Sequence, residues 1–328
     1  MLKVAFIGAG AVADLHAESI RQVDGLQLVG VQDIRGDVAA AKARAWNVRA
    51  FPSVDAILQD PAIGAVFVLT HVDSHLDIAS RAIDAGKHVF LEKPVSDDAD
   101  GIQALADRAR AKGLVCMPDH NYAYIPEFRR LKRLVDSKDL GTIRSFFVIY
   151  VIPHAEELAS RYSGILEEVM IHHSYLSLAV LGKPDHVSAG IAKPGWKKHT
   201  AEDQAWMVWE YERGASAHLF ASFATDDLTN EPWTCLIKVL GTNGSAVVNW
   251  RSAIFHRARG THSMAWDQYE QSFTDAMKVF RDVVTSRDVM ASSLEDAATS
   301  ARIIREAYRA ARTRVVVSRV TAEGKALW

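Results

Sequence analysis

Lys3-Val-Ala-Phe-Ile-Gly-Ala-Gly-Ala-Val-Ala13 is the stretch that decides the fold of this 328-residue chain. Residues 4–7 form a short apolar run with the length of a buried strand, and residues 11–22 are predicted to be helical. Between them lies G-x-G-x-x-A, a form of the dinucleotide-binding fingerprint. The strand before it and the helix after it supply the context that the motif requires. The pattern therefore predicts a nucleotide-binding site near the start of the chain.

Each small residue of the motif has a predicted task. Gly8 lets the chain turn sharply, and Gly10 lets the backbone come close to a pyrophosphate. Ala13 lets the helix pack tightly on the strand. The helix begins at Ala11 and Val12, whose N–H groups are expected to face the bound anion.

Asp33 follows the next predicted strand, Leu26–Gln32, and lies roughly 20 residues beyond the glycines. A carboxylate at this place accepts hydrogen bonds from the ribose hydroxyls of the cofactor and repels a 2′-phosphate, so NAD is predicted rather than NADP. Arg35 could soften that preference and is counted with the cofactor-binding residues. The alternative is that Asp33 only caps a turn.

Composition excludes several classes of protein. The length of 328 residues predicts two domains. The chain is 49% apolar and 24% charged, which is ordinary for a soluble globular protein. The net charge of −2 and the lack of a basic run argue against a nucleic-acid partner. No apolar run has the length of a membrane span, and the early first strand leaves no room for a signal peptide. Two cysteines in apolar surroundings fit a reducing cytoplasm.

The first third of the chain alternates strands and helices. Apolar strands alternating with helices predict an α/β domain, a doubly wound parallel sheet covered on both faces. Such a sheet binds ligands at the carboxyl ends of its strands. The predicted strands after the second are residues 65–70, 88–91 and 114–117. Polar residues lie at the carboxyl ends of these strands: Thr70, Glu92, Lys93 and Asp119–Asn121.

The pattern changes after residue 121. Strands are predicted at residues 143–152, 205–211, 215–223, 234–240 and 245–250, followed by helices at 266–286 and 294–313. Arg213-Gly214 and Thr242-Asn243-Gly244 are hairpin signals, so a mostly antiparallel sheet in an α+β domain is expected. We therefore predict a nucleotide-binding domain at residues 1–121 and a substrate-binding and oligomerisation domain at residues 122–328.

Two further segments carry candidate chemistry. Lys93 precedes Pro94 at a strand end, which favours a functional lysine over a solvated loop residue. In the apolar helix predicted over residues 164–182, Glu168, His172 and Tyr175 share one face. They could line a wet cavity, form a satisfied core pair or an exposed stripe, or hold a metal through Glu168 and His172. No further ligands have convincing spacing, so no metal site is predicted.

In these motifs the chain resembles the glucose–fructose oxidoreductase/inositol dehydrogenase (Gfo/Idh/MocA) family. The resemblance rests on the glycine motif, Asp33, the segment Thr70–His75, Glu92-Lys93-Pro94 and the helix around His172, and it runs to about residue 317. It implies a Rossmann domain, a second domain with a large sheet that is often used for oligomerisation, and NAD(P)-dependent chemistry on a sugar or cyclitol hydroxyl. A homodimer or homotetramer is thus expected.

The resemblance also assigns site residues. Lys93 and His172 match the family's catalytic pair, and Glu168 stands where an aspartate is usual. It places the following residues at the cofactor: Thr70, His71, His75, Glu92, Lys93 and Asn121. It places the following at the substrate: Lys93, Asn121, Tyr122, Glu168, His172 and Tyr175. Glu168, Tyr175, Tyr122 and His71 depart from the residues that the family favours, which leaves the particular sugar or cyclitol open.

Hydride transfer requires a base for the hydroxyl proton, and His172 suits that role, while Lys93 would donate to the same oxygen. Glu168 would orient His172. Two other activities remain open. A glycosidase or lyase acting through transient sugar oxidation by NAD would use the same two residues, and a non-catalytic NAD-binding protein would need neither.

Overall fold

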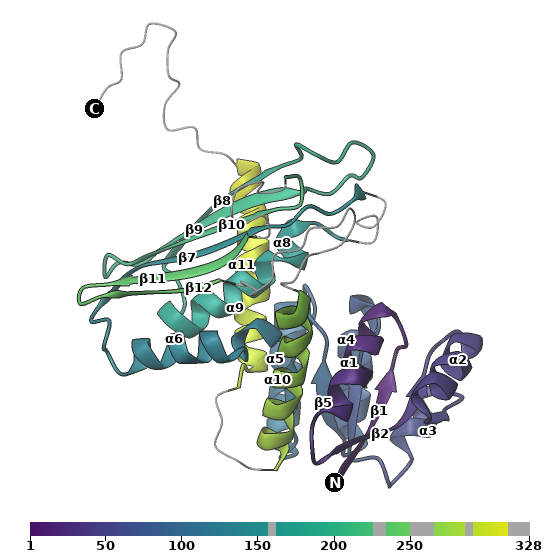
Figure 1. Ribbon diagram of the computed structural model, residues 1–328. Helices are drawn as coiled ribbons and strands as arrows, with labels where there is room; N and C mark the ends of the chain where they lie inside the picture. Colours follow the sequence, from purple (N-terminus) through teal and green to yellow (C-terminus); the bar gives the residue numbers. More distant parts are fainter. Residues whose placement is uncertain (157–161, 226–233, 250–265, 286–290, 314–328) are drawn as a thin grey trace, which may run out of the picture.

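The computed structural model describes residues 1–156, 162–225, 234–249, 266–285 and 291–313. Their strands form two six-stranded sheets, with helices packed against both (Figure 1). The first sheet and its helices come from the beginning of the chain, and the second sheet from the middle.

The first sheet is parallel throughout, in the order β3-β2-β1-β4-β5-β6. Its strands are β1 Leu2–Ile7, β2 Leu26–Gln32, β3 Arg49–Ala50, β4 Ala65–Val68, β5 His88–Leu91 and β6 Cys116–Pro118. The helices between them are α1 Ala11–Arg21, α2 Gly36–Trp46, α3 Val54–Leu58, α4 His75–Asp84 and α5 Ala99–Ala111. The predicted doubly wound parallel sheet is confirmed, with β3 as an additional short strand.

Both faces of this sheet are buried, because alternate residues of each strand face opposite sides. In β1, Val4 and Phe6 lie in one apolar cluster, whereas Ala5 and Ile7 lie in the other. On the first side, Phe6 stacks on Phe67 of β4 at 5.4 Å between ring centroids. Helices on both sides therefore hold the carboxyl ends of the strands in fixed positions.

The second sheet has the order β12-β11-β7-β10-β9-β8, and its strands are antiparallel except for the parallel pair β7–β10. The strands are β7 Ile143–Val151, β8 His186–Ala192, β9 Gln204–Glu210, β10 Ser216–Ser222, β11 Thr234–Gly241 and β12 Ser245–Asn249. The predicted mostly antiparallel sheet is confirmed, including the hairpins at residues 213–214 and 242–244. Strand β8 was not predicted. Residue 250, assigned to the last strand, lies outside the described residues.

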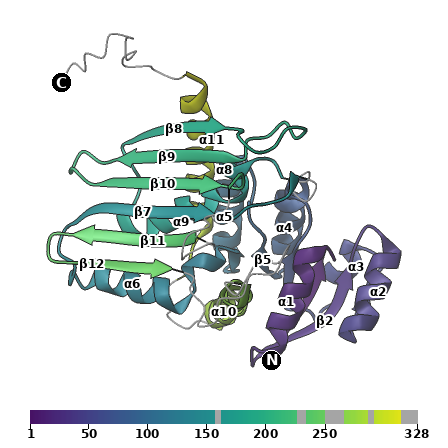
Figure 2. The same ribbon diagram turned by 45° about the horizontal axis from the view of Figure 1, so that its top comes forward.

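Helices cover one face of the second sheet. They are α6 Pro126–Asp136, α8 Ile165–Glu168, α9 Met170–Leu181 and α11 Leu294–Thr313. Figure 2 shows α6, α9 and α11 behind the strands, and no helix of the described residues lies on the opposite face. On that open face Trp206 is 45% exposed and Val247 is 56% exposed.

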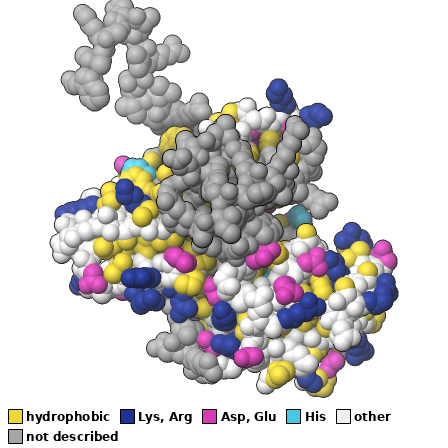
Figure 3. Space-filling view, in the orientation of Figure 1, with side chains coloured by type: hydrophobic (Ala, Val, Ile, Leu, Met, Phe, Trp, Pro, Cys, Tyr) yellow, Lys and Arg dark blue, Asp and Glu magenta, His cyan; other side chains and the backbone are white. Residues whose placement is uncertain are grey.

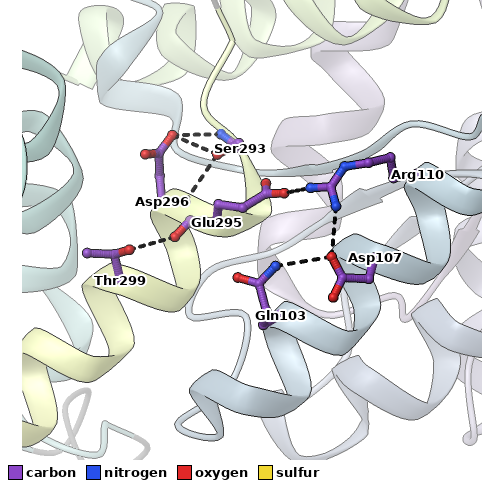
Figure 4. A network of polar contacts seen from close by, with 7 residues as sticks. All are labelled: Gln103, Asp107, Arg110, Ser293, Glu295, Asp296 and Thr299. Carbon is purple, nitrogen blue, oxygen red and sulfur yellow. Dashed lines mark hydrogen bonds and ion pairs between the residues drawn. The ribbon is translucent and has the colours of Figure 1, made fainter.

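The last two helices return to the first sheet. Helix α10 (Trp266–Val284) packs on α1, and α11 packs on α5. Figure 4 shows Arg110 of α5 between Asp107 of the same helix and Glu295 of α11. The predicted start of α11 is confirmed, because Ser293 Oγ accepts from Asp296 N–H and Asp296 Oδ2 accepts from Ser293 N–H. Residues of α10 and α11, which come after residue 121, therefore pack against helices of the first sheet. The domain boundary at residue 121 stays a prediction.

The surface carries charges of both signs. In the view of Figure 3, Lys and Arg side chains are interspersed with Asp and Glu over the part formed by the first sheet and its helices. Among the described helices, none has the length and apolar character that a membrane span requires.

Candidate active site

The turn between β1 and α1 requires glycine at its first motif position. Gly8 has φ +100°, and a Cβ atom there would lie 2.6 Å from the carbonyl oxygen of Leu69. Its N–H donates to Gln32 O of β2 at 2.8 Å. The sharp turn predicted at Gly8 is therefore present, and its neighbours leave no space for a side chain.

The start of α1 has the form of an anion site. Gly10 is the N-cap and has no side chain to cap the helix, and a Cβ atom on it would meet no atom within 4 Å. The first N–H groups of a helix have no partner within the helix and carry its positive dipole end. No atom of the described residues fills this space, so glycine at position 10 leaves room for a bound group to approach the backbone.

Asp33 contacts the glycine loop directly. Its Oδ2 accepts from Ala9 N–H and its Oδ1 from Arg35 N–H, both at 2.9 Å. The Asp33 carboxylate therefore caps a turn, as the alternative hypothesis for this residue predicted. It also borders a pocket of about 620 Å³ at the ends of β2 and β3, where a ribose could reach it. The Arg35 side chain is 64% exposed, with Nε 3.5 Å from Asp33 Oδ1.

A cavity of about 680 Å³, here called the central cavity, runs from the start of α1 to the helices under the second sheet. Nine of the residues predicted for the site line it: Ala11, Val12, Thr70, Glu92, Lys93, Asn121, Tyr122, Glu168 and His172. The fold thus brings the anion site, three strand ends and the predicted catalytic residues to one space. Gly8, Gly10, Asp33, Arg35, His71, His75 and Tyr175 do not line it.

Lys93 is held at the middle of the central cavity. Its Nζ donates to the backbone oxygen of Glu168 at 3.1 Å and to Glu168 Oε2 at 3.3 Å. Burial lowers the pKa of this ammonium group, but the charges of Glu168 and Glu92 outweigh burial and raise it. Lys93 is therefore a fixed cation that can donate to a ligand oxygen.

The helix expected over residues 164–182 is two helices. Helix α8 ends at Glu168 and α9 begins at Met170, with Val169 between them at φ −113°. This break separates the expected pair, because Glu168 contacts Lys93 whereas His172 contacts Tyr175. The prediction that Glu168 orients His172, and the possible metal pair of these residues, have no support in the described contacts.

His172 is oriented by aromatic neighbours. Its Nδ1 lies 2.5 Å from Tyr175 Oη, and the ring of Tyr122 stacks on it at 4.0 Å. Burial, followed by the nearby charge of Lys93, lowers the pKa of His172 well below its usual value. The imidazole is therefore neutral at pH 7, and Nε2 is the ring nitrogen that Tyr175 leaves available. Tyr175 itself, predicted to touch substrate, lies behind His172 and receives a hydrogen bond from Tyr122 N–H at 3.2 Å.

The two histidines near Thr70 do not face the central cavity. His75 is buried, with Nδ1 3.0 Å from Pro94 O and Nε2 2.9 Å from Thr70 O. It joins the loops after β4 and β5 and thereby fixes the position of Lys93 indirectly. His71 is exposed and pairs with Asp73.

A buried polar group, here called the floor cluster, lies beneath the central cavity: His16, Glu92 and Asp119. The sequence placed Glu92 and Asp119 at strand ends, but it did not reveal that His16 joins them. His16 Nε2 donates to Glu92 Oε1 at 2.9 Å and lies 3.7 Å from Asp119 Oδ2. Glu92 and Asp119 follow β5 and β6, while His16 comes from α1. The available signal was a histidine on the mostly apolar buried face of α1, with Ala13, Ala17, Ser19 and Ile20.

The floor cluster is better described as a hydrogen-bonded group than as a metal site. One ligand atom from each of the three residues could lie within 4.8 Å of the others. However, His16 Nδ1 has no hydrogen-bond partner among the described residues, whereas a metal-bound histidine donates its other N–H to a partner. Lys93 N–H donates to Glu92 Oε2 at 2.9 Å, which ties this group to the loop after β5.

Aromatic rings line the far end of the central cavity. The His154 ring stacks on Phe223 at 4.3 Å, and Trp196 stacks on the same phenyl ring at 5.6 Å. Tyr150 and Tyr162 complete this part of the lining. Stacked rings of this kind offer flat faces to a sugar or another ring.

Comparison with known proteins agrees with this architecture. The profile of the oxidoreductase family with an NAD-binding Rossmann fold matches residues 2–120, and that of the GFO/IDH/MocA C-terminal domain matches residues 128–247. The chain therefore belongs to the Gfo/Idh/MocA family of oxidoreductases and contains its NAD-binding domain. The resemblance stated from the motifs is confirmed.

Individual relatives are similar over much of their length. UDP-N-acetylglucosamine 3-dehydrogenase of Acidithiobacillus ferrooxidans is 30% identical over 67% of each chain. scyllo-Inositol 2-dehydrogenase (NAD(+)) of Bacillus subtilis is 26% identical over 75% of this chain and 73% of its own. The crystal structure of a putative myo-inositol dehydrogenase from Sinorhizobium meliloti superimposes with a TM-score of 0.85 at 22% identity, covering 95% of this chain and 98% of that one.

Proposed function

We propose that the protein is an NAD-dependent dehydrogenase or ketoreductase acting on a CH–OH carbon of a sugar, a sugar derivative or a cyclitol. The observation that carries the proposal is the central cavity, in which Lys93 and His172 share one space with the N-terminus of α1. The relatives named above are dehydrogenases of a cyclitol and of a nucleotide sugar, which supports the same class of substrate.

The chain's own residues suit a dinucleotide. The N–H groups of Ala11 and Val12 would hold the pyrophosphate, and Asp33 would accept from the ribose hydroxyls. Glu92, Lys93 and Asn121, which line the cavity beyond the helix, would hold the nicotinamide half of the dinucleotide. When bound, the nicotinamide supplies hydride chemistry, while the protein positions the substrate and handles its proton.

His172 and Lys93 would act on the same substrate oxygen. During oxidation, the neutral imidazole accepts the hydroxyl proton at Nε2, the nitrogen that Tyr175 leaves available. The Lys93 ammonium donates to that oxygen as negative charge develops on it. Glu168 holds Lys93 in place through its side chain and its backbone oxygen.

A substrate screen tests this function. The full-length protein is mixed with NAD or NADP and a panel of hexoses, aminosugars, nucleotide sugars and cyclitols, and the absorbance of the reduced nicotinamide is followed. We expect reduction of NAD by at least one compound of the panel. Tightly retained NAD together with sugar cleavage and no net NADH would instead indicate the glycosidase or lyase activity, which the relatives named here do not favour.

Replacing Asp33 by alanine should raise the KM for NAD by about 10–100-fold, because hydrogen bonds to a charged acceptor contribute about 1.5–3 kcal/mol. The KM for NADP should rise less or fall, since the repulsion of a 2′-phosphate is removed. Steady-state kinetics with both cofactors measure the change. Asp37→Ala, which removes an exposed carboxylate at the start of α2, is the matched control. An unchanged ratio of the two KM values in Asp33→Ala would contradict the assigned preference for NAD.

We also propose that the open face of the second sheet forms a homodimer or homotetramer interface. Trp206 of β9 packs over Gly190 on this face, and Val247 lies on the same face at the edge strand β12, so the face carries large apolar groups that water disfavours. The double variant Trp206→Asp/Val247→Asp should elute as a smaller species in size-exclusion chromatography with light scattering. A monomeric wild-type protein would contradict the proposal. A cytoplasmic location stays a prediction from the sequence.

A further inference from the structure

The floor cluster places two carboxyl groups side by side in a buried site. Both oxygens of Glu92 are engaged, Oε1 by His16 and Oε2 by Lys93 N–H. Asp119 is 1% exposed, and its Oδ1 has no hydrogen-bond partner among the described residues. Two adjacent buried carboxyl groups cannot both ionise at low cost unless a positive charge is nearby.

The position of the floor cluster relative to the cofactor follows from the proposed function, on which this inference rests. A dinucleotide with its pyrophosphate at the start of α1 and its reacting carbon near Lys93 and His172 must cross the space between them. Glu92 and Asp119 line that space. The nicotinamide ring, which is positively charged in NAD+ and neutral in NADH, would therefore share this cavity with the two carboxyl groups.

We propose that Asp119, paired with Glu92 and His16, compensates the charge of the nicotinamide: its carboxyl group is protonated in the free enzyme and with NADH, and it ionises when NAD+ binds. Asp119 would thereby carry one proton fewer when NAD+ is bound than when NADH is bound. The ligand proposed for this site is the cationic pyridinium ring of NAD+, and the neutral dihydropyridine ring of NADH serves as the comparison.

The direction of the pKa shifts agrees with this assignment. Burial, followed by the charge of Glu92, raises the pKa of Asp119 well above its usual value. Burial also acts to raise the pKa of Glu92, but the hydrogen bond and charge of His16 together with Lys93 lower it. Of the two carboxyl groups, Glu92 is therefore the ionised one and Asp119 the protonated one.

The tyrosines and the histidine His120 around Asp119 stay neutral, so they do not take over this role. From α10, Tyr269 and Phe273 border the cavity, and Phe273 packs against His16 at 5.0 Å. Burial raises the pKa values of Tyr124, Tyr175 and Tyr269, so these phenols stay neutral. Burial lowers the pKa of His120 to about 3, so its ring is neutral as well. Lys93 is the nearby cation, and its Nζ is directed to Glu168.

The proton balance of the reaction is closed by this step. In oxidation, His172 would accept the proton of the substrate hydroxyl and then lose it to solvent to become neutral again. Because the bound ring would lose its positive charge in the same reaction, Asp119 would take up one proton. One proton leaves through His172 and one enters at Asp119, so the net release to solution would come only when NADH is exchanged for NAD+. The reverse reaction would reverse both transfers.

Isothermal titration calorimetry of the full-length protein with NAD+ and with NADH tests the inference. Titrations at pH 7 in two buffers of different ionisation enthalpy give the number of protons released on binding. We expect NAD+ to release up to about one proton more than NADH, and its affinity to rise with pH by up to about tenfold per unit below the pKa of Asp119 in the free enzyme. The affinity for NADH should be nearly independent of pH over the same range.

Asp119→Asn should abolish the difference in proton release, since the amide cannot ionise. Asp275→Asn is the matched control, because Asp275 is also a buried aspartate with one unpartnered oxygen among the described residues, yet it lies outside the central cavity. Asp275→Asn should keep the wild-type difference.

Equal proton release by NAD+ and NADH in the wild-type protein would overturn the inference, as would a difference that persists in Asp119→Asn. If Asp119→Asn does not fold, the pH dependence of the two wild-type affinities decides alone, and parallel curves would overturn it. Failure of both nucleotides to bind would refute the proposed function and this inference with it.

Discussion

Turnover should fall at least ~100-fold when Lys93 is replaced by alanine, and by a similar factor when His172 is replaced, which is the lower range for loss of a general acid or base. Lys93→Ala removes the cation beside the substrate oxygen, and His172→Ala removes the group that exchanges its proton. Both changes should reduce kcat more than they raise the KM for NAD, because neither side chain contacts the adenosine half of the cofactor. Steady-state rates on the compound found in the screen provide the measurement.

Two neighbouring residues give matched controls. His173 is buried beside His172, but it does not line the central cavity, so His173→Ala should affect stability more than kcat. Lys112 lies at the end of α5 and pairs with Asp84, so Lys112→Ala should leave kcat unchanged. Near-normal turnover in both Lys93→Ala and His172→Ala would refute the assignment of the catalytic pair.

Gly8→Ala should lower the free energy of unfolding by about 2–6 kcal/mol, the sum expected for a strained positive φ and for overpacking in a close-packed region. The new Cβ atom would lie 2.6 Å from the backbone oxygen of Leu69, which cannot move without disturbing the end of β4. The turn that leads into α1 would have to shift, so NAD binding should also be lost. Chemical denaturation and a calorimetric titration with NAD measure the two effects.

Gly10→Ala is the contrasting variant. Gly10 has φ −69°, and its Cβ position is open, so the fold should lose about 1 kcal/mol or less. The affinity for NAD should nevertheless fall, because the methyl group occupies the space that the pyrophosphate needs. Equal stability of Gly8→Ala and the wild-type protein would contradict the account of the turn.

Local pattern was sufficient to predict most of the fold. The glycine motif, the apolar strands and the hairpin signals each describe contacts between residues that are close in sequence, and all of them are present in the structure. Strand β8 was missed because Gly190 interrupts its pattern. The indole of Trp206 packs over that glycine, which explains why a residue unfavourable for strands is placed there.

The features that sequence could not predict depend on distant contacts. The break at Val169 has no glycine or proline to mark it. Instead, Ile165 N–H donates to Glu202 O and Leu166 N–H donates to Glu202 Oε1, so a loop from the second sheet fixes where α8 lies. The floor cluster likewise joins α1 to the ends of β5 and β6, and no spacing within one segment reveals such a meeting.

Transfer of deuterium from substrate to cofactor reports directly on the proposed hydride transfer. The substrate found in the screen is labelled with deuterium at the CH–OH carbon and incubated with the protein and NAD, and the reduced cofactor is analysed by mass spectrometry. We expect one deuterium on the nicotinamide ring of each NADH formed, and we expect Lys93→Ala and His172→Ala to form labelled NADH at least ~100-fold more slowly. Deuterium found in water, or retained in a cleaved sugar with no labelled NADH, would contradict the proposed hydride transfer.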